Sequence, residues 1–371
     1  MKRVLIMHIS EFGGHKKASE NISEAIKFID PEVKTLNING FGYLYPRSEK
    51  LVDFFYTATI KRIPRLWGKI YDRDSIIKTI SPLKKISNTV GFNKFSHLLK
   101  DFKPGVIVAT QAFPCGIAAD FKKMHRLNIP IFAIVTDYYP HRFWINSSID
   151  NYIVACKEAQ DMLIAEGIDK EKIKILGIPI SHRFLDTYTK EEVASEFGFN
   201  PELPSILIMG GGLGLGPIKD TFLKINKIDS SFQVIVVCGR NKLLYSWFAK
   251  RKNKFKRPVF YFGYINFVNK LMDFSDIIIT KGGGITVSEA LSKSMAIIVI
   301  NPIPGQEERN VNYLLNKKAI VRADNIHEIK DIVKGLLGNP GNLKSLKEAA
   351  HDISIRDSSL RIAYSIINYL G

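Results

Sequence analysis

Short runs of valine, isoleucine and leucine recur along the whole chain, and they constrain its fold more than any other feature. Runs without polar alternation are typical of strands covered on both faces, and hence of parallel sheets joined by helical crossovers. The strand candidates are 3–9, 105–110, 129–136, 151–156 and 173–178 in the first half, and 205–210, 232–239, 259–264, 276–281, 296–302 and 318–324 in the second. These two sets predict an α/β fold with two doubly wound domains.

The length of 371 residues also suits two domains. A short helical pattern and a turn rich in proline and glycine place the boundary between Gly177 and Leu203. We therefore expect one domain over 1–185 and a second over 200–350. The last segment, 355–371, carries an amphipathic stripe. Two such domains facing each other across a cleft commonly hold a nucleotide-bearing donor against an acceptor.

Positive charge is the main compositional signal, because the formal net charge is +17. Segment 47–100 contains twelve Lys or Arg against four Asp or Glu, and segment 240–257 contains eight Lys or Arg and no acid. This excess favours an anionic partner, namely nucleic acid, an acidic membrane surface or a phosphorylated ligand. Cations interleaved with Leu, Ile, Phe and Trp in the first segment predict a membrane-facing surface, with a solvated basic face as the alternative. The second segment is either a further membrane-facing patch or a solvated loop.

No apolar run approaches the roughly eighteen residues that a spanning helix needs, so we expect any membrane contact to be peripheral. The three cysteines, Cys115, Cys156 and Cys238, are too far apart in sequence for a metal knuckle. They indicate reduced thiols and a cytoplasmic protein.

Glycine-rich junctions follow three of the expected strands in the second half. Segment 210–216, "GGGLGLG", contains five glycines, and Pro217 suits the first turn of the next helix. Glycine allows backbone N–H groups to approach a phosphate, and a helix N-terminus adds partial positive charge. The spacing matches neither the dinucleotide fingerprint nor a Walker loop. The five glycines nevertheless favour phosphate binding over the alternative, a tight strand-to-helix turn.

The second junction is "TKGGGITVSEAL", from Thr280 to Leu291. Its glycines can admit a diphosphate, and Thr286 can add a hydroxyl. Glu289 lies one turn into the following helix, where a carboxylate can accept hydrogen bonds from ribose hydroxyls. The alternative is a glutamate that only complements the helix dipole.

The third junction is "NPIPGQEERN", over 301–310. Amide and carboxylate side chains such as Gln306 and Glu307 are common partners of sugar hydroxyls. By itself this segment is equally typical of a capped loop with early-helix acids. Three polar or glycine-rich loops at the carboxyl ends of parallel strands favour a ligand site, because doubly wound folds bind their ligands there.

These motifs together resemble family 28 glycosyltransferases of the two-domain GT-B type, in particular the bacterial diacylglycerol glucosyltransferases and the plant monogalactosyldiacylglycerol synthases. The first half contributes "GGH..AS" from Gly13, "TDYYPHRFW" from Thr136 and "GIP" from Gly177, and the second half contributes the three junctions. The motifs occur in the family's order and cover nearly the whole chain.

The resemblance implies a UDP-sugar in the C-terminal domain. It assigns the diphosphate to Gly211, Gly212, Gly283, Gly284 and Thr286, the ribose to Glu289, and the hexose to Gln306 and Glu307. It also implies that the last helix returns to the N-terminal domain. It assigns the lipid acceptor to the segment with His141 and Trp144, together with Gly14.

Two residues depart from the family pattern. Gly282 stands where the family usually has proline, which predicts a looser loop, and Phe12 stands where the first glycine of Gly-x-Gly-His is usual.

Hexose transfer needs a base for the attacking hydroxyl, and the sequence offers His15 and Asp137. Asp137 can instead orient His15 or cap a helix, and Trp144 can instead be a core aromatic. Asp72 and Asp74 resemble a metal-binding pair, but they lie in a helical, basic region rather than after a strand. GT-B enzymes replace the metal by loop amides and helix dipoles, so we expect no metal and no cofactor besides the donor.

The sequence thus predicts an inverting transferase that moves glucose or galactose from a UDP-sugar to diacylglycerol. The product is a β-glycolipid, made by a peripheral protein on an anionic membrane at the cytoplasmic face. The first alternative is another lipid acceptor, such as a polyprenyl-diphosphate sugar. A basic nucleic-acid-binding protein is the second alternative, disfavoured because no nucleic-acid module is present.

Overall fold

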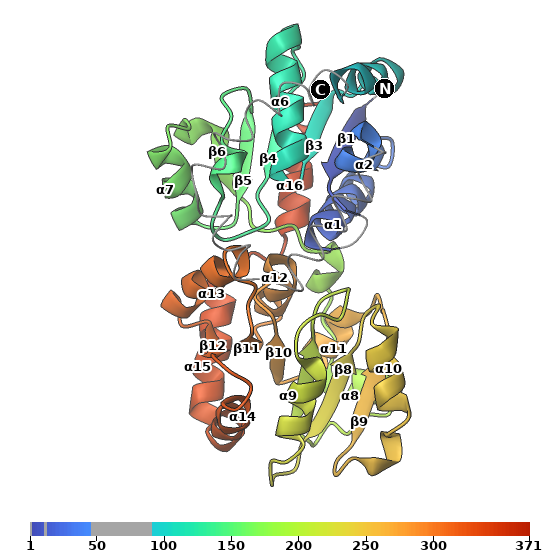
Figure 1. Cartoon of the computed structure of the whole chain (residues 1–371), viewed down its shortest axis with the longest axis vertical. Coiled ribbons are helices and arrows are strands. Elements are labelled where there is room, and N and C mark those ends of the chain that lie inside the picture. Colours follow the sequence, from blue (N-terminus) through green and yellow to red (C-terminus); the bar gives the residue numbers. More distant parts are fainter. Residues whose placement is uncertain (1, 11–12, 46–90) are drawn as a thin grey trace. The chain divides into compact units, whose positions relative to one another are not determined.

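The structure is a computed structural model that describes residues 2–10, 13–45 and 91–371 (Figure 1). Phe12, the pair Asp72 and Asp74, and most of the basic segment 47–100 lie outside the described residues. The chain forms two compact units. The first comprises Met1–His182, Pro304–Gln306 and Asp357–Gly371, and the second comprises Arg183–Ile303 and Glu307–Arg356.

The first unit is built on a six-stranded parallel sheet in the order β2-β1-β3-β4-β5-β6. The strands are β1 (Arg3–His8), β2 (Lys34–Asn39), β3 (Val106–Ala109), β4 (Ile131–Ile134), β5 (Asn151–Val154) and β6 (Ile173–Ile175). The helices are α1 (Gly14–Ile29), α2 (Gly40–Leu44), a helix over 91–102, α6 (Ala112–His125), α7 (Lys157–Ala165) and α16 (Ser358–Ile367), with short 3-10 turns η1 (Arg142–Trp144) and η2 (Lys170–Lys172). All its strand pairs are parallel, as the apolar runs predict.

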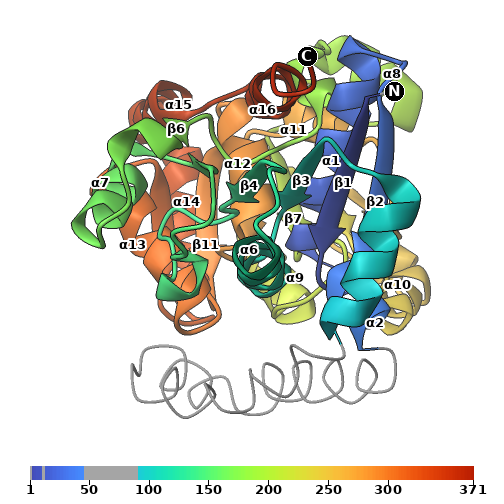
Figure 2. The same cartoon turned by 90° about the horizontal axis from the view of Figure 1, so that it is seen from above.

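The C-terminal helix α16 belongs to this first unit. It packs beside α1, and Figure 2 shows α6 and α16 on opposite faces of the sheet. Ile362, Ala363 and Ile366 are buried in the same core as strand residues of β1 and β4. The hydroxyl of Ser358 donates to the carbonyl oxygen of Ile178 at 2.8 Å, which fixes the start of the helix.

The second unit contains the other six-stranded parallel sheet, in the order β12-β11-β10-β7-β8-β9. Its strands are β7 (Ser205–Met209), β8 (Gln233–Val237), β9 (Val259–Phe262), β10 (Ile277–Thr280), β11 (Ala296–Ile300) and β12 (Ile320–Ala323). Its helices are α8 (Lys190–Phe197), α9 (Ile218–Ile225), α10 (Lys242–Ala249), α11 (Val268–Phe274), α12 (Gly284–Ser292), α13 (Gln306–Asn316), α14 (Ile329–Gly338) and α15 (Pro340–Ile353), with 3-10 turns η3 (His182–Leu185) before α8 and η4 (Lys252–Lys254) after α10.

Strands β7, β10 and β11 are neighbours in this sheet, although α9, β8, α10, η4, β9 and α11 separate β7 from β10 along the chain. The three junctions singled out in the sequence follow these three strands. Parallel strands end at one edge of the sheet, so the topology places the three loops side by side. Within the described residues, no helix is long and apolar enough to cross a membrane.

Candidate functional site

The loops after β7 and β10 approach each other closely. Gly211 has a φ of +70°, a conformation that favours glycine, and a methyl group built on it would lie 3.8 Å from Oγ1 of Thr286 and 4.0 Å from Cε of Lys281. Gly283 is the N-cap of α12, Gly284 begins that helix, and Thr286 lies in its first turn. The structure therefore brings together four of the expected diphosphate residues. Exposed backbone, a helix N-terminus, a hydroxyl and an ammonium group converge at this point, which is a chemistry suited to an anion.

Lys281 is a residue that the sequence analysis did not assign. Its ammonium group forms an ion pair with Oε1 of Glu307, and Oε2 of Glu307 accepts a hydrogen bond from the backbone N–H of Ile303 at 2.9 Å. Glu307 is buried, with 7% of its surface exposed. The carboxylate expected to bind the hexose is therefore held in place from two sides, and Lys281 lies between it and the glycine loops.

Gly282, which stands at the family's proline position, is tightly packed. A methyl group built on it would lie 2.7 Å from Cγ2 of Val311 and 3.0 Å from the carbonyl oxygen of Glu307. Its own carbonyl oxygen accepts a hydrogen bond from the buried side chain of Asn310 at 3.4 Å. This packing differs from the looser loop expected from the sequence, because α13 fills the space beside residue 282.

Glu289 is the sixth residue of α12, and only 8% of its surface is exposed. The first turn of α12 contains no acidic residue, so the alternative role in complementing the helix dipole does not apply. Gln306 is the first residue of α13, and it groups with the first unit, whereas the rest of the helix from Glu307 belongs to the second. Both therefore lie on the helices that follow β10 and β11, within the first two turns after the glycine-rich and proline-rich loops.

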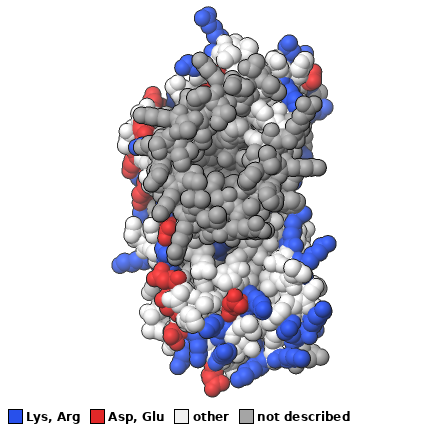
Figure 3. Space-filling model, viewed as in Figure 1, with Lys and Arg blue, Asp and Glu red and all other residues white. Residues whose placement is uncertain are grey.

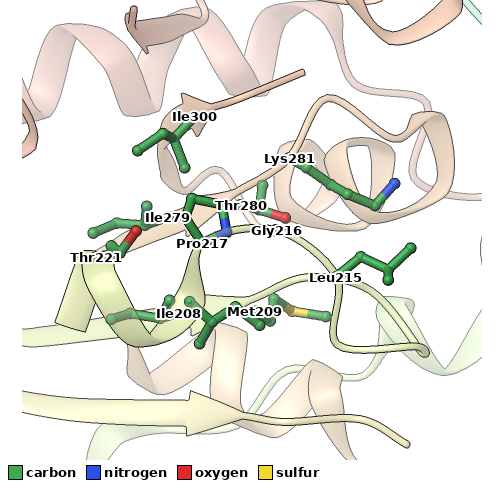
Figure 4. Close-up of a pocket in the computed structure, with 11 residues that line it drawn as sticks. Ile208, Met209, Leu215, Gly216, Pro217, Thr221, Ile279, Thr280, Lys281 and Ile300 are labelled. Carbon is green, nitrogen blue, oxygen red and sulfur yellow. The ribbon is translucent and has the colours of Figure 1, made fainter. Parts of the chain in front are cut away.

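A small hollow lies beneath the loop after β7, against the ends of β10 and β11 (Figure 4). Leu215, Pro217 and Lys281 are among its lining residues. Thr221 and Thr280 also line it, and within the described residues their buried hydroxyl oxygens have no hydrogen-bond partner. The hollow therefore offers polar groups that a water molecule or a ligand oxygen can satisfy.

An aromatic group and a guanidinium group also lie beside the glycine loop, and the sequence analysis assigned neither. A methyl group built on Gly212 would lie 3.5 Å from Cε2 of Tyr264. The Tyr264 ring is 55% exposed, and the guanidinium carbon of Arg240 lies 4.9 Å from its centroid. An exposed ring at this position can stack on a planar base. In the sequence Tyr264 is only an aromatic residue shortly after a strand, a pattern too common to identify a binding residue without the fold.

His15 lies in the first unit. It is the second residue of α1, the helix that follows β1 along the chain. Its Nδ1 lies 2.8 Å from the carbonyl oxygen of Thr110 and 3.1 Å from the hydroxyl oxygen of Thr136. A carbonyl oxygen only accepts, so Nδ1 carries the hydrogen, and the neutral ring presents its lone pair on Nε2. Burial lowers the pKa of His15, although the hydrogen bond to Thr110 opposes this effect.

Thr110 follows β3 and Thr136 follows β4, so neighbouring strand ends hold the imidazole. The group that orients His15 is the Thr110 carbonyl, a role that the sequence left to Asp137. Gly14, the first residue of α1, is exposed beside it. Asp137 is 7% exposed and follows Thr136.

The segment after Asp137 contains the expected acceptor residues. Nδ1 of His141 accepts a hydrogen bond from the backbone N–H of Phe143 at 3.1 Å and so caps the short helix η1. Trp144 is only 5% exposed, which fits the alternative of a core aromatic. Tyr139 and Phe143 are 43% and 47% exposed, and they are the side chains of this segment that can contact an apolar ligand. The sequence could not choose between these aromatics, because exposure within a loop follows no period.

Comparison with known proteins gives two family matches that divide the chain. Residues 15–180 match monogalactosyldiacylglycerol (MGDG) synthase, and residues 205–358 match the glycosyltransferase family 28 C-terminal domain. Along its whole length the chain is 30% identical over 373 residues to a processive diacylglycerol beta-glucosyltransferase of Staphylococcus epidermidis, and the match covers 93% of that protein. The chain therefore belongs to the family of diacylglycerol beta-glucosyltransferases and MGDG synthases, within glycosyltransferase family 28. A Bacillus subtilis protein of the same description is 26% identical over 374 residues, with 99% of this chain and 95% of that protein covered.

Solved structures show that this family member has the GT-B fold. MurG of Acinetobacter baumannii matches with a TM-score of 0.64 at 12% identity, over 99% of this chain and all of that one. MnaA of S. aureus, in a co-structure with UDP, matches with a TM-score of 0.66 at 15% identity, over all of this chain and 97% of that one. The prediction of two Rossmann-like domains in a GT-B fold is confirmed.

Proposed function

We propose that this chain transfers glucose from UDP-glucose to the 3-hydroxyl of diacylglycerol and inverts the anomeric centre to give a β-glycolipid. The observation that carries the proposal is the full-length similarity to diacylglycerol beta-glucosyltransferases, together with the convergence of three loops in the second unit. Between the two hexoses expected from the sequence, the names of these relatives favour glucose.

The donor binds in the second unit, which we equate with the UDP-sugar domain expected over 200–350. The loop amides and the helix N-terminus at Gly211, Gly283 and Gly284, with the Thr286 hydroxyl, hold the diphosphate. The carboxylates of Glu289 and Glu307 accept hydrogen bonds from hydroxyl groups of the ribose and the hexose. Fixed donors of this kind stabilise the charge that develops on the departing UDP, an effect strongest in the transition state.

The acceptor binds in the first unit, over 1–185 with the returning segment 355–371. Nε2 of His15 removes the proton from the 3-hydroxyl of diacylglycerol, whose oxygen attacks C1 of glucose. The bond between C1 and the β-phosphate oxygen breaks, and UDP leaves with the electron pair. Support for His15 comes from its tautomer and from its lowered pKa, which keeps the ring neutral near pH 7. Asp137 is the alternative base.

The acceptor resides in a bilayer, so we propose that the protein works as a peripheral protein on the anionic cytoplasmic face of the membrane. The excess of 53 Lys and Arg over 36 Asp and Glu supports attraction to such a surface.

A turnover assay tests the proposal. Purified protein receives UDP-glucose or UDP-galactose with diacylglycerol in anionic liposomes, and both UDP and glycolipid are quantified. We expect a β-glucolipid from UDP-glucose and at least tenfold less product from UDP-galactose. UDP release without glycolipid would move the search to another acceptor such as a polyprenyl-diphosphate sugar. Glycolipid from UDP-galactose alone would reverse the choice of sugar.

A matched pair of variants tests the base. His15→Ala should lower kcat by at least a hundredfold and leave UDP binding unchanged, because general bases contribute about 10²–10⁴-fold. Asp137→Asn should then retain more activity than His15→Ala. Full turnover by His15→Ala with loss in Asp137→Asn would transfer the role to Asp137.

A further inference from the structure

A long stretch of the second unit lacks acidic residues. Between Asp229 and Asp273 the sequence has no Asp or Glu, but it has nine Lys or Arg. This stretch contains β8, α10, η4 and β9, at one edge of the second sheet, and then most of α11. The cations in its middle are therefore displayed by one continuous piece of local structure, rather than scattered over the unit.

Helix α10 separates its buried face from its exposed face clearly. Leu244 and Phe248 point into the core, with 8% and 0% of their surfaces exposed. Lys242 and Lys250 are on the exposed face, and so is Leu243, which is 85% exposed. Tyr245 is 42% exposed on the same helix. The Tyr245 ring packs edge-on against Tyr261 of β9, with 5.3 Å between the ring centroids, and leaves the rest of its surface open. Leu243, in contrast, is exposed enough to contribute little to the fold, and its burial against another apolar phase is favourable.

The lysines of this surface are exposed. Lys242, Lys250, Lys252, Lys254 and Lys256 are all exposed, and none forms an ion pair with any residue in the described part of the chain. Figure 3 shows Lys and Arg side chains gathered over the side of the second unit that carries α10 and β9. Their charge is thus available to an external anion.

Neighbouring cations have internal roles and are distinct from this surface. The guanidinium carbon of Arg257 lies 3.6 Å from the centroid of the Phe232 ring, and its Nη2 donates to the carbonyl oxygen of Ile228 at 2.6 Å. Arg251 lies over the Trp247 ring, with 4.9 Å between its guanidinium carbon and the ring centroid. We define the α10 patch as the exposed side chains of Lys242, Leu243, Tyr245, Lys250, Lys252, Lys254 and Lys256.

We infer that the α10 patch is a docking surface for an anionic lipid bilayer. Lysines attract phosphate head groups, while Leu243 and Tyr245 enter the interface between head groups and acyl chains. An exposed leucine between lysines favours a bilayer over nucleic acid, whose binding uses phosphate contacts and stacking rings. The inference rests on the proposed function, because an enzyme that uses a lipid acceptor must reach a bilayer. It adds a contact from the second unit, separate from the basic segment 47–100.

Vesicle binding by the full-length protein tests the inference. The vesicles contain phosphatidylcholine with 30 mol% phosphatidylglycerol, or phosphatidylcholine alone, and neither diacylglycerol nor UDP-glucose is present. Lys250→Glu/Lys254→Glu should weaken binding to the anionic vesicles by at least roughly 30-fold, because the loss of each lysine near such a surface lowers affinity by about fivefold and the added glutamates repel the surface further. The matched control is Lys330→Glu/Lys334→Glu, which makes the same charge change at two exposed lysines of α14 in the same unit.

Leu243→Ser separates a bilayer from other polyanions. We expect it to weaken vesicle binding by roughly tenfold and to leave retention on heparin unchanged, because only a bilayer offers an apolar phase. Equal loss of vesicle binding in the α14 control would overturn the inference in favour of net charge. Unchanged vesicle binding in both patch variants would overturn it outright. If Leu243→Ser bound vesicles like the wild type and Lys250→Glu/Lys254→Glu lost binding to RNA, the partner of the α10 patch would be nucleic acid rather than a bilayer.

Failure of the proposed function would be recognised separately. Binding is read without turnover, so a patch-dependent vesicle interaction in a protein that makes no glycolipid would sustain the inference and reject the proposed reaction. Turnover of a short-chain diacylglycerol in neutral detergent micelles should be equal in the wild type and Lys250→Glu/Lys254→Glu.

Discussion

Replacing Gly282 by alanine should destabilise the second unit. The added methyl group would lie 2.7 Å from Cγ2 of Val311, a stiff β-branched side chain, and 3.0 Å from a backbone carbonyl oxygen. Val311 is fully buried at 0% exposure, so it cannot move into solvent. The φ of Gly282 is not positive, and the cost is therefore steric rather than conformational. Overpacking of this kind costs about 1–3 kcal/mol.

Truncation of Val311 should partly relieve the clash. Val311→Ala by itself removes two buried methyl groups and costs roughly 2 kcal/mol. The double variant should lose about 2–3 kcal/mol, rather than the sum of roughly 4, because the methyl group added at position 282 occupies part of the vacated space. The relief is incomplete because the Glu307 carbonyl oxygen does not move with Val311. A coupling energy of about 1 kcal/mol or more is expected.

Hydrogen exchange read by mass spectrometry at β10 and β11 measures these changes within this unit alone, and 2 kcal/mol corresponds to a roughly 30-fold faster exchange. Gly335→Ala is the matched control, since a methyl group there meets no atom within 4 Å in helix α14. That variant should slow exchange, because alanine is favoured over glycine in a helix by about 0.5–1 kcal/mol. Wild-type exchange in Gly282→Ala, or strictly additive losses in the double variant, would refute the steric reasoning.

Three further predictions concern ionisable groups of the proposed site. Lys281→Met leaves the buried carboxylate of Glu307 without its cation and should cost about 3 kcal/mol in urea unfolding, whereas Lys344→Met, at an exposed ion pair, should cost under about 1. Adding Glu307→Gln should recover most of the Lys281→Met loss, and no recovery would contradict the pairing. The acidic limb of kcat/KM should have its midpoint below pH 6.5, because burial lowers the pKa of His15, and a higher midpoint would argue against this base. The free energy of unfolding should also decline as pH falls through 6.5, because the unfolded chain then binds a proton that the folded chain does not yet bind. Glu289→Gln should bind UDP roughly tenfold more weakly in calorimetry and no longer distinguish it from 2′-deoxy-UDP, whereas retained discrimination would exclude the ribose role.

Strand prediction succeeded where the sequence is continuously apolar, including the outer strands β6, β9 and β12, and it failed at the outer strand β2. Eleven of the strands coincide with the apolar runs, but β2, Lys34–Asn39, was missed. Its sequence, "KTLNIN", mixes polar and apolar residues; β2 is an outer strand that pairs, among the described residues, with β1 alone, and none of its residues is fully buried. Burial on both faces selects continuous apolar residues, whereas an edge strand tolerates polar ones.

Candidate site residues were predictable where a motif forces a backbone shape. Three glycines after a strand identify a loop that comes close to a ligand, which led to Gly211, Gly283 and Gly284. No comparable constraint marks Lys281 or Tyr264. Each is an ordinary residue in sequence, and each becomes a candidate only because it lies beside the glycine loops in space.

The sequence by itself determined the fold class, eleven of the strands and the family, because uninterrupted apolar runs and glycine-rich junctions are local signals with a direct physical cause. The tertiary structure alone decided which loops are neighbours, since β7 and β10 pair across six intervening elements. It also decided that Thr110 fixes the tautomer of His15, that α13 fills the space beside Gly282, and that α10 turns Leu243 outward among exposed lysines. Contacts between distant segments, and the burial that follows from them, have no local signature in the chain.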